Sequence, residues 1–189
     1  ENNLPSFIVA HDTLSEKKAK ELGLPNVITI KNYALLAQLQ NYTHLPQSNT
    51  VLFLSEPTAK VALASFGNAY FWGFTEKEVF EDILTCKTLL GCEDILIRLH
   101  PSDTPQTYQA IDSTVRFSTA SLLEDIACAK IIVGIDTVAL YTAYLLGKKV
   151  ISYIPSTKRE CSVPLPHTNQ LTSFEHFTLE QLSSASHNP

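Results

Sequence analysis

The sequence predicts an α/β protein: a doubly wound, Rossmann-like parallel sheet preceded by a short N-terminal α/β segment. Short runs of continuous apolar residues recur along the chain, and such runs are typical of strands buried on both faces of a parallel sheet. Between them lie amphipathic stretches that begin with helix-capping residues and end at glycine. The 189 residues, 44% of them hydrophobic and 17% charged, are enough to build a sizeable core.

Residues 1–45 are expected to be the end of a preceding domain together with a linker. Residues 41–49 are polar and include a proline, which is typical of a connection between domains. The pattern Thr13-Leu14-Ser15-Glu16 fits a capping box, and Gly23 fits the end of the helix that it starts. The expected elements are a strand at 7–10, a helix at 13–22, a strand at 27–30 and a helix at 33–40.

Residues 46–189 are expected to form one Rossmann-like domain. Capping-box patterns at 75–78 and 121–124 mark the starts of two helices. Residues 58–74 are rich in aromatic side chains and fit neither a helix nor a strand pattern. The expected strands are 51–54, 94–100, 115–117, 131–133 and 150–154. The expected helices are 76–90, a short one near Tyr108, 121–129, 137–146 and a last one that starts at Thr178, with a loop at 156–170.

Composition excludes several classes of protein. The net charge of −5 argues against a nucleic-acid-binding surface, since such domains are usually basic. No apolar stretch reaches the roughly 18 residues of a membrane span, and no signal peptide is visible. The four cysteines form no CxxC pair and have no histidine pair at zinc spacing, so we expect reduced thiols, with disulfides left open. No DxD motif occurs, and Asp103 and Asp112 are not paired, so we expect no metal; we also expect no cofactor. Because the chain begins with Glu1 and contains no methionine, we expect a fragment that lacks an N-terminal partner domain.

Polar residues follow most of the expected strands. In a parallel sheet the carboxyl ends of all strands share one edge, and ligands of doubly wound folds bind there. Hydroxyl groups and the N–H groups at helix starts are good partners for phosphate. The candidate residues at this edge are Ser55, Glu56, Arg98, His100, Pro101, Ser118, Thr119, Asp136 and Thr137. A purely structural role also stays open, because such hydroxyl and carboxylate residues are typical helix caps and turn residues.

The segment Arg98-Leu99-His100-Pro101 carries the strongest signal, because it puts a cation and an imidazole at the end of an apolar run. Arg98 and His100 are two residues apart, so both side chains face the same side of a strand and offer two contacts to an anion. We therefore expect a phosphate-bearing ligand here, with His100 as the catalytic residue. The alternative is that Arg98 pairs with an acid close in sequence: Glu93, Asp94 or Asp103.

At these residues the chain resembles the C-terminal half of the GT-B glycosyltransferases. The segments ILIRLHP (95–101) and EDIACAKIIVGIDTVALYTAYLLGKKVISYIP (124–155) are similar to the bacterial sialyltransferases and capsule polymer transferases with an HP motif. The resemblance implies a Rossmann-like donor-nucleotide domain in which His100 contacts the donor phosphate. It places a second phosphate-binding pair at Asp136 and Thr137. The segment Glu21-Leu22-Gly23-Leu24-Pro25 resembles the close of a GT-B N-terminal half.

Three departures from the family pattern stand out. Asp136 replaces a serine, and a carboxylate repels phosphate. Thr142 lies about where many GT-B proteins have a ribose-binding glutamate. The acidic motif that supplies the acceptor-activating base in sialyltransferases belongs to the N-terminal half and is not found in this chain. We therefore expect this chain to be inactive by itself, since transfer needs a base near the acceptor hydroxyl.

The leading hypothesis is the donor-binding domain of an inverting, sialyltransferase-like bacterial enzyme of cell-surface polysaccharide or glycan synthesis. Its partners would be a CMP- or CDP-linked sugar, a glycan acceptor and the missing N-terminal domain. Ser55 and Glu56 would face the sugar. The expected location is the cytoplasm, including the surface of the inner membrane. The alternatives are a non-catalytic interaction or regulatory module of the same fold, and a nucleotide-sugar epimerase or hydrolase.

Overall fold

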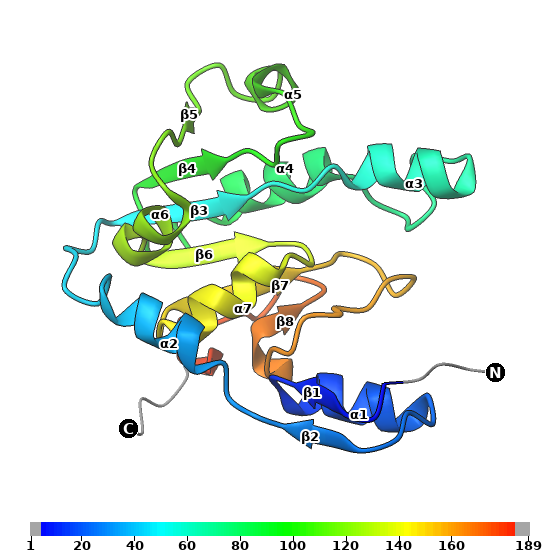
Figure 1. Ribbon diagram of the computed structural model, residues 1–189. Coiled ribbons are helices and arrows are strands. Elements are labelled where there is room, and N and C mark those ends of the chain that lie inside the picture. Colours follow the sequence, from blue (N-terminus) through cyan, green and yellow to red (C-terminus); the bar gives the residue numbers. More distant parts are fainter. Residues whose placement is uncertain (1–4, 184–189) are drawn as a thin grey trace. The chain divides into compact units, whose positions relative to one another are not determined.

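A computed structural model describes residues 5–183 (Figure 1). The chain divides after Asn41 into two compact units. The first contains a two-stranded parallel sheet, with its strands in register from Ile8–Val27 to Ala10–Thr29. Its elements are β1 (Ile8–Ala10), α1 (Thr13–Glu21), β2 (Val27–Thr29) and α2 (Tyr33–Gln40).

The start of α1 differs from the prediction. The N-cap is Asp12, one residue before Thr13, and its carboxylate accepts a hydrogen bond from the backbone N–H of Ser15 at 2.7 Å. An ionised carboxylate accepts a backbone N–H more strongly than a hydroxyl does, and it also suits the positive end of the helix dipole. The predicted capping box at Thr13-Leu14-Ser15-Glu16 is therefore wrong, although the predicted helix is present.

The second unit begins at Tyr42 and contains a six-stranded sheet in which every neighbouring pair is parallel. The strand order is β5-β4-β3-β6-β7-β8. The strands are β3 (Thr50–Leu54), β4 (Asp94–Arg98), β5 (Arg116–Phe117), β6 (Ile131–Gly134), β7 (Lys149–Tyr153) and β8 (Gln170–Leu171). The predicted Rossmann-like α/β fold is confirmed, since this order is that of a doubly wound sheet.

Helices cover both faces of this sheet. In Figure 1, α4 lies behind the central strands, and α6 and α7 lie in front of them. The helices are α3 (Thr58–Phe66), α4 (Glu76–Cys86), α5 (Pro105–Gln109), α6 (Leu122–Cys128) and α7 (Val138–Leu145), followed by short 3₁₀ turns at His167–Asn169 and Leu179–Gln181. Within residues 5–183, no helix has the length and apolar character to cross a membrane.

Local sequence explains where most of these helices begin. Thr75 with Glu78, and Ser121 with Glu124, form the two predicted capping boxes. Thr178 also forms a capping box, but the turn that follows is 3₁₀ and only three residues long. In each box a hydroxyl and a carboxylate or amide satisfy backbone N–H groups that have no partner inside the helix.

Helix α3 has no counterpart in the sequence prediction. It begins after Pro57 without a side-chain cap, and it ends at Gly67 in the left-handed conformation, with φ of 70°. Three of its apolar side chains, Val61, Leu63 and Phe66, are exposed. The apolar residues therefore do not mark a single buried face, and the periodic pattern that identifies a surface helix is missing.

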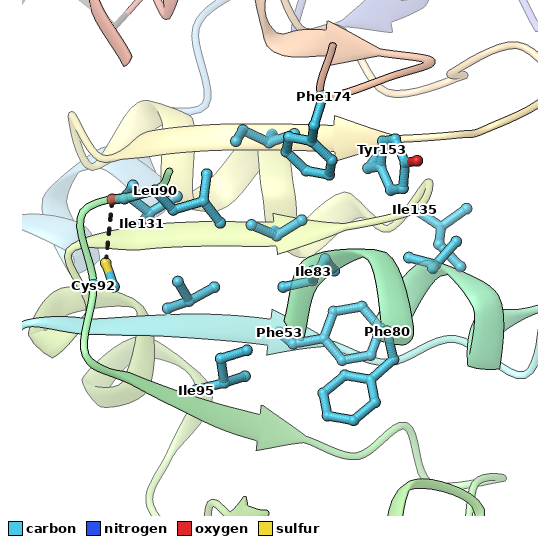
Figure 2. Packing of buried hydrophobic residues seen from close by; sticks show 14 of the residues in the cluster. Phe53, Phe80, Ile83, Leu90, Cys92, Ile95, Ile131, Ile135, Tyr153 and Phe174 are labelled. Carbon is cyan, nitrogen blue, oxygen red and sulfur yellow. Dashed lines mark hydrogen bonds between the residues drawn. The ribbon is translucent and has the colours of Figure 1, made fainter. Parts of the chain in front are cut away.

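The core lies between α4 and the sheet (Figure 2). Phe53 and Phe80 pack at 5.5 Å between ring centroids, and Tyr108 packs edge-on against Phe80 at 5.3 Å. All three side chains are fully buried. This packing holds β3 and the segment after β4 in place, and both lead directly to the carboxyl edge of the sheet.

The chain reverses direction across the sheet between β5 and β6. From β3 it proceeds to β4 and β5 on one side, and then β6 returns to the other side of β3. The loops after β3 and β6 therefore diverge at the carboxyl edge. Such a topological switch point is where ligands of open α/β sheets bind.

Candidate functional site

Three neighbouring strands deliver most of the predicted site residues to one edge. In register, Leu54 of β3 pairs with Arg98 of β4 on one side and with Gly134 of β6 on the other. His100 lies two residues after Arg98, and Asp136 lies two residues after Gly134. Parallel strands lie about 4.8 Å apart, so all three loops start close together. The juxtaposition of loops that the sequence predicted is therefore present in the structure.

Ser55 organises the loop that contains the HP motif. Its hydroxyl accepts a hydrogen bond from the backbone N–H of His100 at 2.8 Å and donates to Asp103 Oδ2 at 2.6 Å. The buried Tyr108 hydroxyl donates to the same carboxylate oxygen at 3.2 Å. Burial raises the pKa of Tyr108 strongly, so the phenol remains a donor. These bonds also end β4 at Arg98 rather than at the predicted residue 100, because the His100 N–H bonds a side chain instead of a neighbouring strand.

His100 lies at the exposed end of this loop with one defined tautomer. Its Nδ1 accepts a hydrogen bond from the backbone N–H of Ser102 at 3.1 Å. A neutral imidazole with an acceptor at Nδ1 carries its proton on Nε2. His100 and Pro101 are both exposed, so this Nε2–H is available as a donor to a ligand.

Arg98 is engaged elsewhere. Its guanidinium donates to the carboxylate of Asp125 at 2.7 Å and to the carbonyl oxygen of Ala120 at 2.8 Å. Ser118 donates to the other oxygen of Asp125 at 2.6 Å. Asp125 is buried on α6, with a side chain only 4% exposed. Arg98 is thus paired, but with a distant acid rather than with Glu93, Asp94 or Asp103, and Arg98 and Ser118 together anchor α6. Thr119, next to them, is exposed.

Glu56 bridges to the other side of the switch point. Its Oε1 accepts a hydrogen bond from the backbone N–H of Asp136 at 2.6 Å. The side chain is only 14% exposed. Burial is the main cause that raises the pKa of Glu56 to about 7, and the Asp136 N–H and the nearby Arg159 partly oppose it. Near neutral pH this carboxyl group can hold or release a proton, which is the property expected of a group in a reaction site.

Asp136 ties down the loop that follows β7. Its carboxylate accepts hydrogen bonds from the backbone N–H of Ser162 at 2.7 Å, the Ser162 hydroxyl at 3.0 Å and the Val163 N–H at 3.3 Å. Its neighbour Thr137 is the N-cap of α7, and its hydroxyl accepts the Ala139 N–H at 3.4 Å. The carboxylate therefore meets donors from its own chain, which explains how an acid is accommodated at this place.

Arg159 and Trp72 belong to this edge, and the sequence prediction missed both. The Arg159 guanidinium carbon lies 4.7 Å from the centre of the Trp72 ring, and Nη2 lies 3.3 Å from Asp136 Oδ2 and 3.7 Å from Glu56 Oε2. The Ser156 hydroxyl donates to the Trp72 carbonyl at 2.5 Å. One signal could have identified the arginine: a basic pair, Lys158-Arg159, follows a strand that ends at the same edge.

A separate cavity lies away from this edge. It has a volume of about 370 Å³ and lies next to residues that precede β3 and β7. Its lining includes Lys148, which donates to the carbonyl oxygens of Ala127 and, at 3.2 Å, Ala129. Burial lowers the pKa of this lysine. Because it caps the end of α6, its donors serve the fold, and the switch point remains the better candidate site.

Among residues 5–183, no group of three or more histidine, cysteine or acidic side chains is arranged to hold a metal ion. Cys86, Cys92, Cys128 and Cys161 are all free thiols.

In comparisons with known proteins, no family model matches the chain, and a search of curated proteins found no significant match.

Proposed function

We propose that the second unit binds a nucleotide-activated sugar and is the donor domain of a glycosyltransferase. The substrate we favour is a CMP- or CDP-linked sugar, because the HP-motif families that the chain resembles use cytidine nucleotides. Transfer to a glycan acceptor would need the base and acceptor site of a further domain. The product class would be a cell-surface polysaccharide or related glycan.

One observation carries this proposal. Two consecutive residues after β3 reach in opposite directions, Ser55 to the backbone of His100 and Glu56 to the backbone of Asp136. They join the HP loop and the start of α7 at the switch point of the sheet. An imidazole donor on one side of the switch point and a helix start on the other are groups that suit a phosphate.

The residues have distinct roles in this proposal. His100 Nε2–H donates to the phosphate that leaves with the nucleotide and stabilises the charge that develops there. Thr137 and the first N–H groups of α7 orient the same phosphate. Glu56 faces the sugar side. Arg98 and Ser118 we assign to the support of α6, because both are engaged with Asp125.

We propose a cytoplasmic location, which includes the surface of the inner membrane. Four free thiols support a reducing compartment, since disulfides persist mainly in oxidising ones.

Thermal unfolding of the full chain with a nucleotide panel tests the proposal. The panel is CMP, CDP, UMP and UDP, with cytidine as the nucleoside control. A specific binder raises the midpoint by an amount that grows with ligand concentration. We expect the cytidine nucleotides to give the largest rise and cytidine alone a smaller one. A midpoint that no nucleotide changes would refute donor binding.

A non-catalytic module of the same fold is the second candidate. The exposed Leu63 and Phe66, three residues apart on α3, and the exposed Phe71, which stacks on Phe66 at 3.9 Å between ring centroids, favour it. Contiguous exposed apolar residues are typical of interaction surfaces. The same panel distinguishes the two functions, because a module that has lost the donor site shows no nucleotide-dependent shift.

A further inference from the structure

We propose that Arg159, held on the face of Trp72, supplies the positive charge that binds the ligand's phosphate at the switch point. This deepens the proposed function and rests on it, because it names the cation of the same site. Of the two arginines near this edge, the sequence pointed to Arg98.

The two arginines differ in how closely their guanidinium groups contact acidic side chains. Arg98 makes a short, 2.7 Å contact with an almost fully buried carboxylate, and its removal would leave that charge without a cation. Arg159 lies 3.3 Å and 3.7 Å from its two acids, longer than the roughly 2.7–2.9 Å of a strong charge-assisted hydrogen bond. Arg159 is therefore the cation that can be shared with a ligand.

Its remaining donors are available. Both acid contacts use the same nitrogen, Nη2. A guanidinium has five N–H donors in one plane, so Nε and Nη1 each keep a donor that can bind a phosphate oxygen singly. The side chain is 18% exposed, which leaves part of it open to solvent. The Trp72 ring, 4.7 Å from the guanidinium carbon, helps to hold the guanidinium in place and so reduces the entropy lost on binding.

The two acids do not depend on Arg159 for all of their hydrogen bonds. Asp136 keeps three donors from Ser162 and Val163, and Glu56 keeps the backbone N–H of Asp136. Burial also raises the pKa of Glu56 to about 7, so at neutral pH this group carries only part of a negative charge. A phosphate can therefore take up the free side of the guanidinium without leaving two unpartnered carboxylates.

Isothermal titration of the full chain with CMP and with cytidine tests this assignment. Arg159→Gln keeps a planar polar group but removes the charge, whereas Lys158→Gln removes an adjacent, exposed charge from the same loop. We expect Arg159→Gln to weaken CMP binding at least tenfold and to leave cytidine binding within twofold. Lys158→Gln should change neither, and Arg159→Lys should lie between Arg159→Gln and the wild type for CMP.

The outcomes separate the two proposals. Arg159→Gln binding CMP as the wild type does, or losing CMP and cytidine equally, would overturn the assignment while donor binding stands. A wild-type chain that binds neither compound would remove the proposed function and this assignment with it. Retained cytidine binding also shows that the variant is folded at the site.

Discussion

Glu56 Oε1 accepts the backbone N–H of Asp136 at 2.6 Å, across 80 positions of sequence. The bond joins the ends of β3 and β6, where the two halves of the sheet diverge. It also orients the Asp136 main chain so that its carboxylate meets the loop after β7. One largely buried side chain thus connects three loops at the edge where ligands of open α/β sheets bind.

Glu56→Gln should change how stability depends on pH. Because the folded-state pKa of about 7 lies above the ordinary 4.5, the folded protein holds the proton more tightly than the unfolded chain does. The stability that this provides is full below pH 4.5 and is lost as pH rises through about 7. A shift of this size corresponds to at most about 3 kcal/mol. The glutamine side chain keeps an oxygen that can accept the backbone N–H of Asp136, and it does not titrate.

Urea unfolding of both proteins at pH 5 and pH 8 measures this difference. From pH 5 to pH 8, the unfolding free energy of the wild type should fall relative to that of Glu56→Gln. Equal changes in the two proteins would show that Glu56 titrates normally in the fold.

His100→Ala should weaken CMP binding by about 1–3 kcal/mol, as expected for the loss of a hydrogen bond to a charged group. Titration calorimetry measures the affinity, and His176→Ala is the control because that side chain is 90% exposed, on a different loop. Unchanged affinity in His100→Ala would remove the histidine from the ligand site. The variant should unfold at nearly the same urea concentration as the wild type, since an exposed side chain contributes little to stability.

Arg98→Met should affect stability rather than binding. The substitution leaves the buried Asp125 carboxylate with Ser118 but without its cation. We expect the unfolding free energy to fall by about 2–4 kcal/mol, somewhat less than the roughly 3–5 kcal/mol for a fully buried pair, because the Arg98 side chain is 30% exposed. CMP affinity should stay within about twofold at temperatures where the variant is folded. A large loss of CMP affinity with unchanged unfolding free energy would show that Arg98 binds the phosphate.

Ser55→Ala should destabilise the fold through the HP loop. Ser55 is 5% exposed, and its hydroxyl accepts the His100 N–H and donates to Asp103. Its removal leaves a donor and an acceptor without this partner, at a cost of about 1–3 kcal/mol. Urea unfolding provides the measurement, and Ser113→Ala, at an exposed serine in a turn, is the matched control. Equal stability of Ser55→Ala and the wild type would contradict the proposed role of this network.

Local patterns were sufficient to predict most elements of the sheet. The apolar runs at β3, β6 and β7 identify strands that are buried on both faces, and two capping boxes identify helix starts. These signals depend on the spacing of residues within a few turns or pleats, and this spacing is visible in the chain. Helix α3 lacks both a side-chain cap and a buried apolar stripe, and so it was not predicted.

The sequence alone therefore determined that strands alternate with helices and that polar residues follow the strands. The tertiary structure decided which of these residues meet. Arg98 pairs with Asp125, 27 positions away, and Arg159 lies against Trp72 and beside Glu56, because strand order brings their loops together. Periodicity reports which side of an element is buried, whereas side-chain partners depend on which strands become neighbours, and no short-range pattern contains that information.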